Sequence, residues 1–311
     1  MTSARPEPAT FSRIKLFLAL SRTSHGILDM ATPTLAALLW LGAFPPLHIV
    51  FLGLMTTFAG YTAVYALNDV VDYRIDKEKL GRTGLNGQGS DLDTLWVRHP
   101  IAQGLLSFRE GLCWALGWSI VALIGASLLN PVCAIIFILG SALEALYCLL
   151  LKITHHRVII SGGVKTSGAI AAVFAVDPVP EVGYLISLFM LFFLWEIGGQ
   201  NVPNDWADME EDRALQAKTV PVCFGSDFSI RIVLGALLCT VAITPLPFLF
   251  SKGRFEWPYL AAAEIAAGCL LILPAVRLRQ VKAPRLAMAL FNSASYFPLA
   301  LLAIVLVKLM L

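Results

Sequence analysis

Long apolar stretches recur along almost the whole chain and leave few ways for it to fold. Nine of them are long enough, or nearly long enough, to cross a bilayer as helices. Within lipid every backbone polar group needs an internal hydrogen bond, which a helix supplies within one segment. Only 14% of the residues are charged, against roughly 25% in soluble domains. The sequence therefore predicts an all-α polytopic membrane protein, a bundle of nine transmembrane helices at approximately 14–42, 47–70, 111–129, 132–151, 158–176, 182–203, 229–250, 257–277 and 289–311.

We expect residues 1–311 to form a single integral-membrane domain. Lysine and arginine are distributed unequally between the two sides that nine spans create. The N-terminal segment and the even-numbered loops carry 18 of the 23 basic residues, whereas the opposite side carries three. Because basic loops stay in the cytoplasm, loops 72–110 and 204–228 are predicted to lie there. The net charge of +2 gives no reason to expect a nucleic-acid partner.

Two polar patterns of the same form interrupt the apolar chain, each at the end of a predicted helix. A spacing of four residues places the members of each pattern on one helical face. The two helices run in the same direction, so both patterns emerge on the same side of the membrane. We call them the first and second acidic trios; they are Asn68, Asp72 and Asp76, and Asn204, Asp208 and Asp212.

Aligned carboxylates repel one another unless a cation lies between them, and Mg²⁺ favours oxygen ligands that it shares with phosphate groups. The two trios therefore predict a Mg²⁺ site for a diphosphate, in which the metal neutralises a leaving pyrophosphate. In a membrane the natural carrier of a diphosphate is an isoprenyl chain. A solvated helix end and a polar seam between helices are the structural alternatives. The functional alternatives are a cation-coupled transporter, whose site would lie nearer the bilayer midplane, and a membrane phosphotransferase.

Further motifs accompany the two trios. RHPIAQG occupies residues 98–104, and the second acidic run continues to Lys218 and Thr219. Tyr147 precedes Lys152 at the end of the fourth predicted helix. Together these stretches resemble the UbiA superfamily of intramembrane prenyltransferases. The resemblance implies Mg²⁺-dependent transfer of a prenyl group from an isoprenyl diphosphate, with release of pyrophosphate. It also implies residence in the cell membrane of a bacterium or archaeon, with the active site facing the cytoplasm.

The resemblance, together with position in the chain, assigns roles to residues around the trios. The trios are the predicted metal ligands. Asp69 and Asp205 adjoin them, and we expect these two residues to orient the acceptor or take its proton, with Lys152 as a further catalytic residue. The predicted diphosphate-binding residues are Arg22, Arg98, Lys152 and Lys218. The alternative for Arg98 and Lys218 is that they only contribute to the positive charge of the cytoplasmic loops. The alternative for Arg22 is contact with lipid headgroups.

The acceptor is the part of the reaction that the sequence defines least. An aromatic quinone precursor such as 4-hydroxybenzoate is favoured on frequency within the superfamily; haem, chlorophyllide and glycerol phosphate lipids are the alternatives. Two departures from the family pattern concern the cytoplasmic side: a longer loop at 77–97 and a histidine between Arg98 and Pro100. Within the fifth predicted helix, Lys165 is expected to form a structural ion pair with Glu144 or Glu196.

Overall fold

The apolar stretches form helices, and no strand is present in the described residues, 12–83 and 97–311. In this part of the chain the computed structural model has eight helical runs long and apolar enough to cross a membrane. They confirm the predicted all-α membrane protein, with eight such runs in place of nine. The runs are α4 (Leu47–Val71), α6 (Phe108–Leu129), α7 (Pro131–Leu149), α8 (Arg157–Val176), α9 (Val182–Trp195) with η2 (Glu196–Asn201) and α10 (Val202–Ala207), α12 (Val220–Ile243) with α13 (Pro245–Phe250), α14 (Trp257–Ala267) with η3 (Gly268–Ile272) and α15 (Leu273–Val281), and α16 (Pro284–Ser295) with α17 (Phe297–Met310).

The remaining predicted span, 14–42, is divided into three short helices. They are α1 (Arg13–Leu20), α2 (Thr23–Asp29) and α3 (Ala31–Leu41). The first break lies at Arg22, whose φ of 42° is left-handed, a conformation that is uncommon outside glycine. The expected bend in this segment is therefore present, and none of its pieces is long enough to count as a span.

Local sequence signals explain where several helices begin. Ser107 and Glu110 form a reciprocal capping box at the start of α6, which satisfies backbone N–H groups that the helix leaves without partners. The Asn130 side chain accepts a hydrogen bond from the backbone N–H of Val132, and Pro131 occupies the first turn of α7, where its missing N–H costs nothing.

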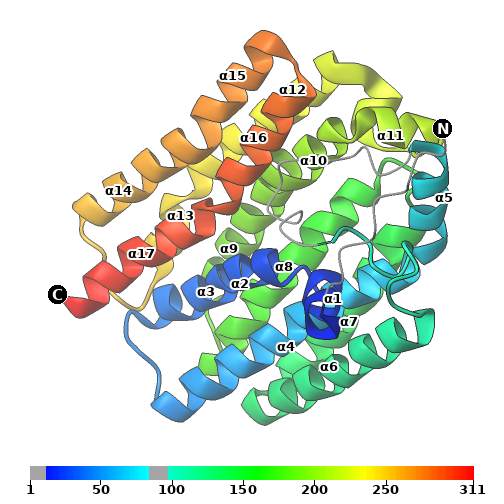
Figure 1. Ribbon diagram of the computed structural model, residues 1–311. Helices are drawn as coiled ribbons and strands as arrows, with labels where there is room; N and C mark the ends of the chain where they lie inside the picture. The colour runs from blue at the N-terminus through cyan, green and yellow to red at the C-terminus, as the bar shows by residue number, and fades with distance from the viewer. Residues whose placement is uncertain (1–11, 84–96) are drawn as a thin grey trace, which may run out of the picture.

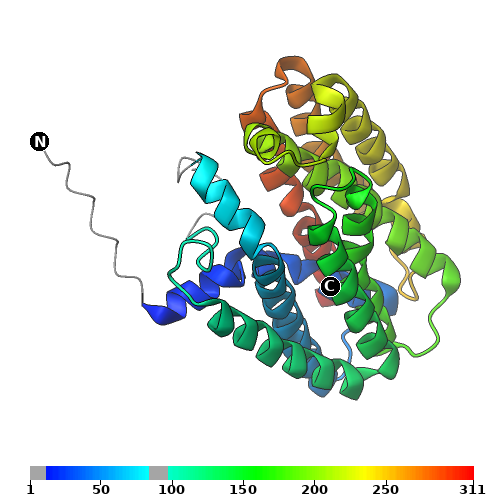
Figure 2. The ribbon, with the colours of Figure 1, turned by 90° about the vertical axis from the view of Figure 1, so that its right-hand side faces the viewer.

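A buried apolar core runs through α9 and the helices around it. Figures 1 and 2 show how the helices of the bundle are arranged. Helix α4 packs against α6, α7 against α8, and α3 against both α8 and α17. Tyr184, Leu188 and Phe192 of α9 are completely buried in this core. In contrast, Ile120 and Leu128 of α6 are 58% and 69% exposed. An outward apolar face of this kind is suited to lipid, because lipid is as apolar as the side chains.

A π-helical segment, η2, interrupts the run that carries the second acidic trio. Two adjacent glycines, Gly198 and Gly199, lie within it. A Cβ atom on Gly198 would come within 2.9 Å of the Ala236 Cβ, and one on Gly199 within 2.9 Å of the Ala294 Cβ. The glycines therefore let η2 approach α12 and α16 closely. The wider turn also rotates the residues that follow it, and it adds Asn201 to Glu196 and Gln200 on the wall of the internal cavity.

Both acidic trios cross a helix boundary at their central aspartate. Asp72 ends α4 before α5 (Tyr73–Thr83), and Asp208 separates α10 from α11 (Met209–Ala214). The backbone N–H of Asp72 still donates to the Asn68 carbonyl and that of Asp76 to the Asp72 carbonyl, each at 2.9 Å. The helical spacing of the trios is thus kept across the breaks. Much of the predicted loops 72–110 and 204–228 is helical, and residues 84–96 of the predicted insert lie outside the described part.

Candidate active site

The two acidic trios lie at the same end of the bundle, where α5 contacts α11 (Figure 1). Basic residues that follow the first trio contact the second: the Lys79 Nζ lies 3.4 Å from the Asp208 Oδ2 and 2.6 Å from the Glu211 Oε2. The Arg98 Nη2 lies 2.8 Å from the Asp208 Oδ2. Burial opposes the charge of Asp208, but Lys79 and Arg98 lower its pKa. Asp208 is therefore a carboxylate held between two cations.

The residues of the first trio face different neighbours. The Asn68 Nδ2 donates to the Glu144 Oε1 at 2.6 Å, and the Asn68 Oδ1 accepts from the Arg22 Nη2 at 3.4 Å. The Asp76 Oδ2 instead lies 2.9 Å from the Nδ1 of His99. Asn68 thus lies beside membrane-embedded residues, whereas Asp76 belongs to the polar end of the bundle.

His99 lies between two carboxylates that the sequence places near the metal site. Its Nδ1 is 2.9 Å from the Asp69 Oδ1 and 2.9 Å from the Asp76 Oδ2. Burial opposes the charge of the imidazole, but Asp76 and Asp69 raise its pKa to about 9. Sequence reasoning noted this histidine as a departure from the family pattern without giving it a role. The available signal was its insertion next to Arg98, which binds the second trio.

Carboxylates in this region are crowded, and their acid–base properties reflect it. Burial and the nearby Asp76 raise the pKa of Asp72 to about 6. Burial and the nearby Asp205 raise the pKa of Asp212 to about 7. Each shift shows that a further negative charge is unfavourable at that position. A cation bound among these groups would relieve the repulsion.

Asp205, the predicted acid beside the second trio, has a buried partner that sequence reasoning missed. The Arg157 Nη2 lies 3.5 Å from the Asp205 Oδ1. Its guanidinium lies 4.0 Å from the centroid of the Tyr147 ring and also donates to the Tyr147 hydroxyl. Arg157 falls in the short predicted loop between the spans 132–151 and 158–176, yet only 6% of the residue is exposed. Tyr147 was noted only as the start of a Tyr–Lys pair with Lys152.

The predicted diphosphate-binding residues fall into two groups. Arg22 contacts the first trio and Arg98 the second. The other two residues have different contacts. The Lys152 Nζ donates to the Glu78 Oε2 at 2.7 Å, and the backbone N–H of Lys218, whose side chain is exposed, donates to the Leu151 carbonyl at 2.7 Å.

The donor set at this end of the bundle fits a hard divalent cation. Ligand atoms of Asp69, Asp76 and His99 lie within 4.8 Å of one another. The two trios add further carboxylate and amide oxygens, which are the ligands that Mg²⁺ prefers. Positive side chains occupy positions beside these oxygens, as His99 and Arg98 show. The clustered carboxylates therefore need positive charge nearby to offset their repulsion.

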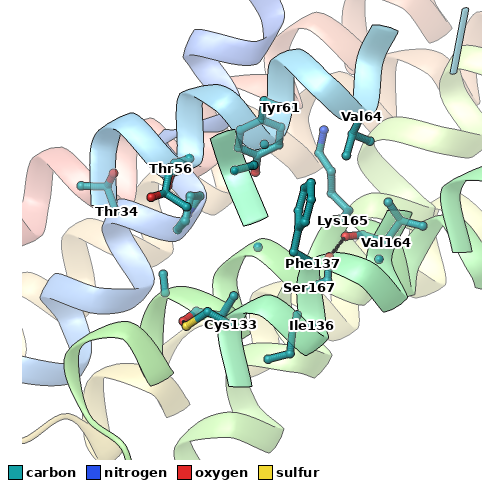
Figure 3. A pocket seen from close by; sticks show the side chains of 18 of the residues that line it. Thr34, Thr56, Tyr61, Val64, Cys133, Ile136, Phe137, Val164, Lys165 and Ser167 are labelled. Carbon is teal, nitrogen blue, oxygen red and sulfur yellow. Dashed lines mark hydrogen bonds between the residues drawn. The ribbon is translucent and has the colours of Figure 1, made fainter. Parts of the chain in front are cut away.

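A cavity of about 460 Å³ extends from the trios into the membrane-spanning part of the bundle. Arg22, Asn68 and Asn204 line its polar end. Further along, its wall carries apolar side chains such as Phe137 and Ile136, and Figure 3 shows them across from α4. The cavity thus joins a charged end to a long apolar interior.

The side chain of Lys165 of α8, 15% exposed, lies on the wall of this cavity (Figure 3). The Lys165 Nζ lies 2.6 Å from the Asp29 Oδ2, and the Tyr65 hydroxyl donates to the same oxygen. The predicted ion pair of Lys165 is therefore present, with Asp29 as a partner that the sequence did not suggest. Asp29 is 136 residues away in the chain, so local spacing could not reveal it.

Replacing His99 by alanine is expected to destabilise the metal-free protein more than the metal-loaded one. Without the imidazole, Asp69 and Asp76 face each other with no cation between them, and breaking a buried ion pair costs about 3–5 kcal/mol. Added Mg²⁺ should restore most of the loss. Thermal unfolding in detergent, with and without Mg²⁺, measures the effect, and His156→Ala at an exposed position is the control. An equal loss of stability under both conditions would contradict the prediction.

The structure is thus an integral-membrane helical bundle with two acidic clusters at one end and, beneath them, a cavity suited to a ligand with a polar head and an apolar tail. The sequence model of the UbiA prenyltransferase family matches residues 30–297, and the chain belongs to this family. Its members are prenyltransferases, which transfer alkyl groups other than methyl.

Individual relatives agree with this assignment. A digeranylgeranylglyceryl phosphate synthase of Methanopyrus kandleri is 33% identical where the two sequences match. The match covers 56% of this chain and 62% of that relative's length. A 4-hydroxybenzoate octaprenyltransferase of Aromatoleum aromaticum is 29% identical over 84% of each chain. The fold is similar to that of a UbiA homologue from Archaeoglobus fulgidus bound to DMAPP and Mg²⁺, with a TM-score of 0.67 and 16% identity over 95% of this chain and 99% of that one.

Proposed function

We propose that this enzyme transfers a prenyl group from an isoprenyl diphosphate to an acceptor held in the internal cavity. One observation carries the proposal: the same cavity is lined by Asn68 of the first trio, Asn204 of the second, and a long apolar wall. A diphosphate headgroup fits the polar end, and an isoprenyl tail fits the apolar interior. Family membership supports the reaction class.

The donor headgroup is proposed to bind at the two trios, whose oxygens would hold Mg²⁺: Asn68, Asp72, Asp76, Asn204, Asp208 and Asp212. When bound, Mg²⁺ supplies Lewis-acid stabilisation of the charge that develops on pyrophosphate. The Archaeoglobus fulgidus homologue bound to DMAPP and Mg²⁺ supports the choice of this metal and of this class of donor.

The chain's own cations are proposed to complete the headgroup site. Arg22 lies at the mouth of the cavity beside Asn68, and Arg98 lies beside Asp208. Their guanidinium groups can turn from amide and carboxylate oxygens to diphosphate oxygens, to which arginine binds in a bidentate manner. Lys152 contacts Glu78, and the backbone N–H of Lys218 donates to the Leu151 carbonyl. Binding of the diphosphate by these two lysines stays a prediction.

The apolar wall protects the reacting carbon. Cleavage of the C1–O bond leaves an allylic cation on the prenyl chain and moves the electron pair to pyrophosphate. Aromatic side chains such as Tyr61 and Phe137 line this region and exclude water (Figure 3). The tyrosine and phenylalanine faces carry the negative side of their quadrupoles, which favours a nearby cation.

The acceptor is proposed to be an aromatic quinone precursor such as 4-hydroxybenzoate. Similarity to digeranylgeranylglyceryl phosphate synthases favours a second candidate, a glycerol phosphate lipid. Asp69 and Asp205 stay predictions as residues that orient the acceptor or take its proton; in the structure they contact His99 and Arg157. The distribution of basic residues favours a site that opens to the cytoplasm of a bacterial or archaeal cell.

Product analysis tests the proposal. The purified protein, in lipid nanodiscs with Mg²⁺, is incubated with geranyl or geranylgeranyl diphosphate and a panel of acceptors that includes 4-hydroxybenzoate and a glycerol phosphate lipid. Mass spectrometry should detect one prenylated acceptor, with an equal amount of released pyrophosphate. Absence of both pyrophosphate release and product over the whole panel would overturn the proposed function.

A further inference from the structure

The cavity beneath the trios follows α4 for nearly the whole length of that helix. Residues of α4 line the cavity at every third or fourth position from Asn68 back to Ile49. Because a helix advances 1.5 Å per residue, this wall is about 28 Å long. The facing wall follows α7 with the same spacing, from Glu144 back to Cys133. The cavity is therefore long enough for an extended chain.

Polar side chains in the inner part of the cavity already donate to the backbone. The hydroxyls of Thr34 and Thr56 each donate to the carbonyl four residues earlier, at 2.8 and 2.7 Å. The Cys133 thiol donates to the Ala171 carbonyl of α8 at 3.1 Å. Figure 3 shows these three side chains around the inner cavity. Since their hydrogens are used within the protein, this wall suits a hydrocarbon chain better than a polar group.

Two glycines lie where the aromatic side chains of Tyr61 and Phe137 line the cavity (Figure 3). A Cβ atom on Gly60 of α4 would lie 3.7 Å from the Phe137 Cε2. A Cβ atom on Gly168 of α8 would lie 3.4 Å from the Tyr61 hydroxyl oxygen. Both glycines also line the cavity. A side chain longer than a methyl group at either position would therefore fill space beside the rings.

Positions along α4 give the depth of the cavity in units of a prenyl chain. Gly60 lies eight residues before Asn68, about 12 Å along the helix. Gly53, which also lines the cavity, lies fifteen residues before Asn68, about 22 Å along it. An extended chain advances about 1.2 Å per bond, so an isoprene unit with four bonds along the chain covers about 5 Å. With the headgroup at Asn68, two units end near Gly60 and four units end near Gly53.

We propose that the cavity selects a donor with at least four isoprene units, and that Gly60 admits the chain beyond the second unit. This inference rests on the proposed prenyl transfer and adds the length of the donor chain. Each unit that enters the apolar inner part leaves water or lipid for a wall that it contacts closely, which favours the longer donor. Geranyl diphosphate, with two units, leaves the inner part unfilled, and geranylgeranyl diphosphate is the shortest donor that reaches Gly53.

Competition between two donors tests the role of Gly60. The full-length protein, in lipid nanodiscs with Mg²⁺ and an acceptor that it uses, receives equal amounts of geranyl and geranylgeranyl diphosphate, and mass spectrometry measures both products. Gly60→Leu should lower the ratio of geranylgeranyl to geranyl product about 100-fold or more, because two isoprene units lose their place. The matched control is Gly117→Leu, which should leave the ratio unchanged. Gly117 is an exposed glycine of α6 that does not line the cavity, and a Cβ atom there would meet nothing within 4 Å.

A second variant and a binding measurement locate the chain along the cavity. Gly53→Leu should retain transfer from geranylgeranyl diphosphate but lose transfer from a donor with six isoprene units, since only the longer chain passes this position. Photo-crosslinking reports the bound chain without turnover. A geranylgeranyl diphosphate analogue with a diazirine on its last unit should label α7 around Cys133, eleven residues before Glu144, whereas the geranyl analogue should label Phe137. Gly60→Leu should abolish the labelling near Cys133.

Several results would overturn the inference. They are an unchanged product ratio in Gly60→Leu, an equal loss of both products in that variant, which would indicate a structural role, and diazirine labelling of outward-facing residues such as Ile120 in place of the cavity wall. A preference of the unmodified protein for the geranyl donor would also contradict it. If the unmodified protein transfers neither donor to any acceptor, the proposed function itself fails, and the labelling still shows where the chain binds.

Discussion

Replacement of Asp208 by asparagine is expected to lower Mg²⁺-dependent prenyl transfer about 100- to 1,000-fold, the loss typical of removing one preorganised electrostatic contact to a transition state. Asp208 is the carboxylate of the second trio that binds both Arg98 and Lys79. Asparagine keeps the size of the side chain but removes its negative charge. The variant should fold, because the two cations remain accessible enough to find other partners.

The same substitution should also weaken metal binding, which can be measured without turnover. We expect a higher Mg²⁺ concentration for half-maximal thermal stabilisation of the variant, since one anionic ligand is lost. Glu210→Gln is the control: Glu210 is an exposed acid in the same helix as Asp212, and its activity should stay within about twofold of the unmodified protein. Full Mg²⁺-dependent transfer by Asp208→Asn would refute the proposed role of the trios.

The helical membrane fold could be predicted from sequence because lipid removes the alternatives. Apolar stretches of sufficient length must be helical, and eight of the predicted spans correspond to helical runs. The remaining span is divided at Arg22, whose left-handed backbone breaks the helix, and again at Met30. Hydropathy does not register a change of this kind, because φ at one position is set by tertiary contacts.

The placement of the trios at one end of the bundle was predictable for a similar reason. Their spacing of four is a local property, and the parity of the spans fixes the side on which each trio emerges. The partners of these residues were not predictable in the same way. His99 reaches Asp69 across 30 residues, and Arg157 lies 48 positions before its partner Asp205. Such pairs depend on how helices pack, which one sequence does not specify.

The π-helical turn illustrates an intermediate case. The polar residues Glu196, Gln200 and Asn204 follow a spacing of four, which predicts an uninterrupted α-helix. The adjacent Gly198 and Gly199, and Pro203 in the first turn of α10, are local hints that the backbone departs from it. The departure moves Asn201 onto the cavity wall, a position that the spacing of four could not reveal.

Replacement of Arg157 by methionine is expected to give the largest loss of stability among single substitutions at the site. Arg157 is 6% exposed, its guanidinium lies over the Tyr147 ring, and its Nη2 is 3.5 Å from the Asp205 Oδ1. Methionine fills the volume but leaves Asp205 buried without its cation. Removing one partner of a buried ion pair costs about 3–5 kcal/mol. Thermal unfolding in detergent, followed by tryptophan fluorescence, should show a large fall in Tm.

A double variant distinguishes the lost ion pair from lost packing. If the uncompensated charge of Asp205 causes the instability, Arg157→Met combined with Asp205→Asn should be more stable than Arg157→Met alone, because the orphaned carboxylate is gone. If packing on the Tyr147 ring dominates, the second substitution should bring no recovery. Arg213→Met, at an exposed position, should leave Tm nearly unchanged. Recovery in the double variant would show that Arg157 stabilises the fold through its charge, by pairing with Asp205 beside the second trio.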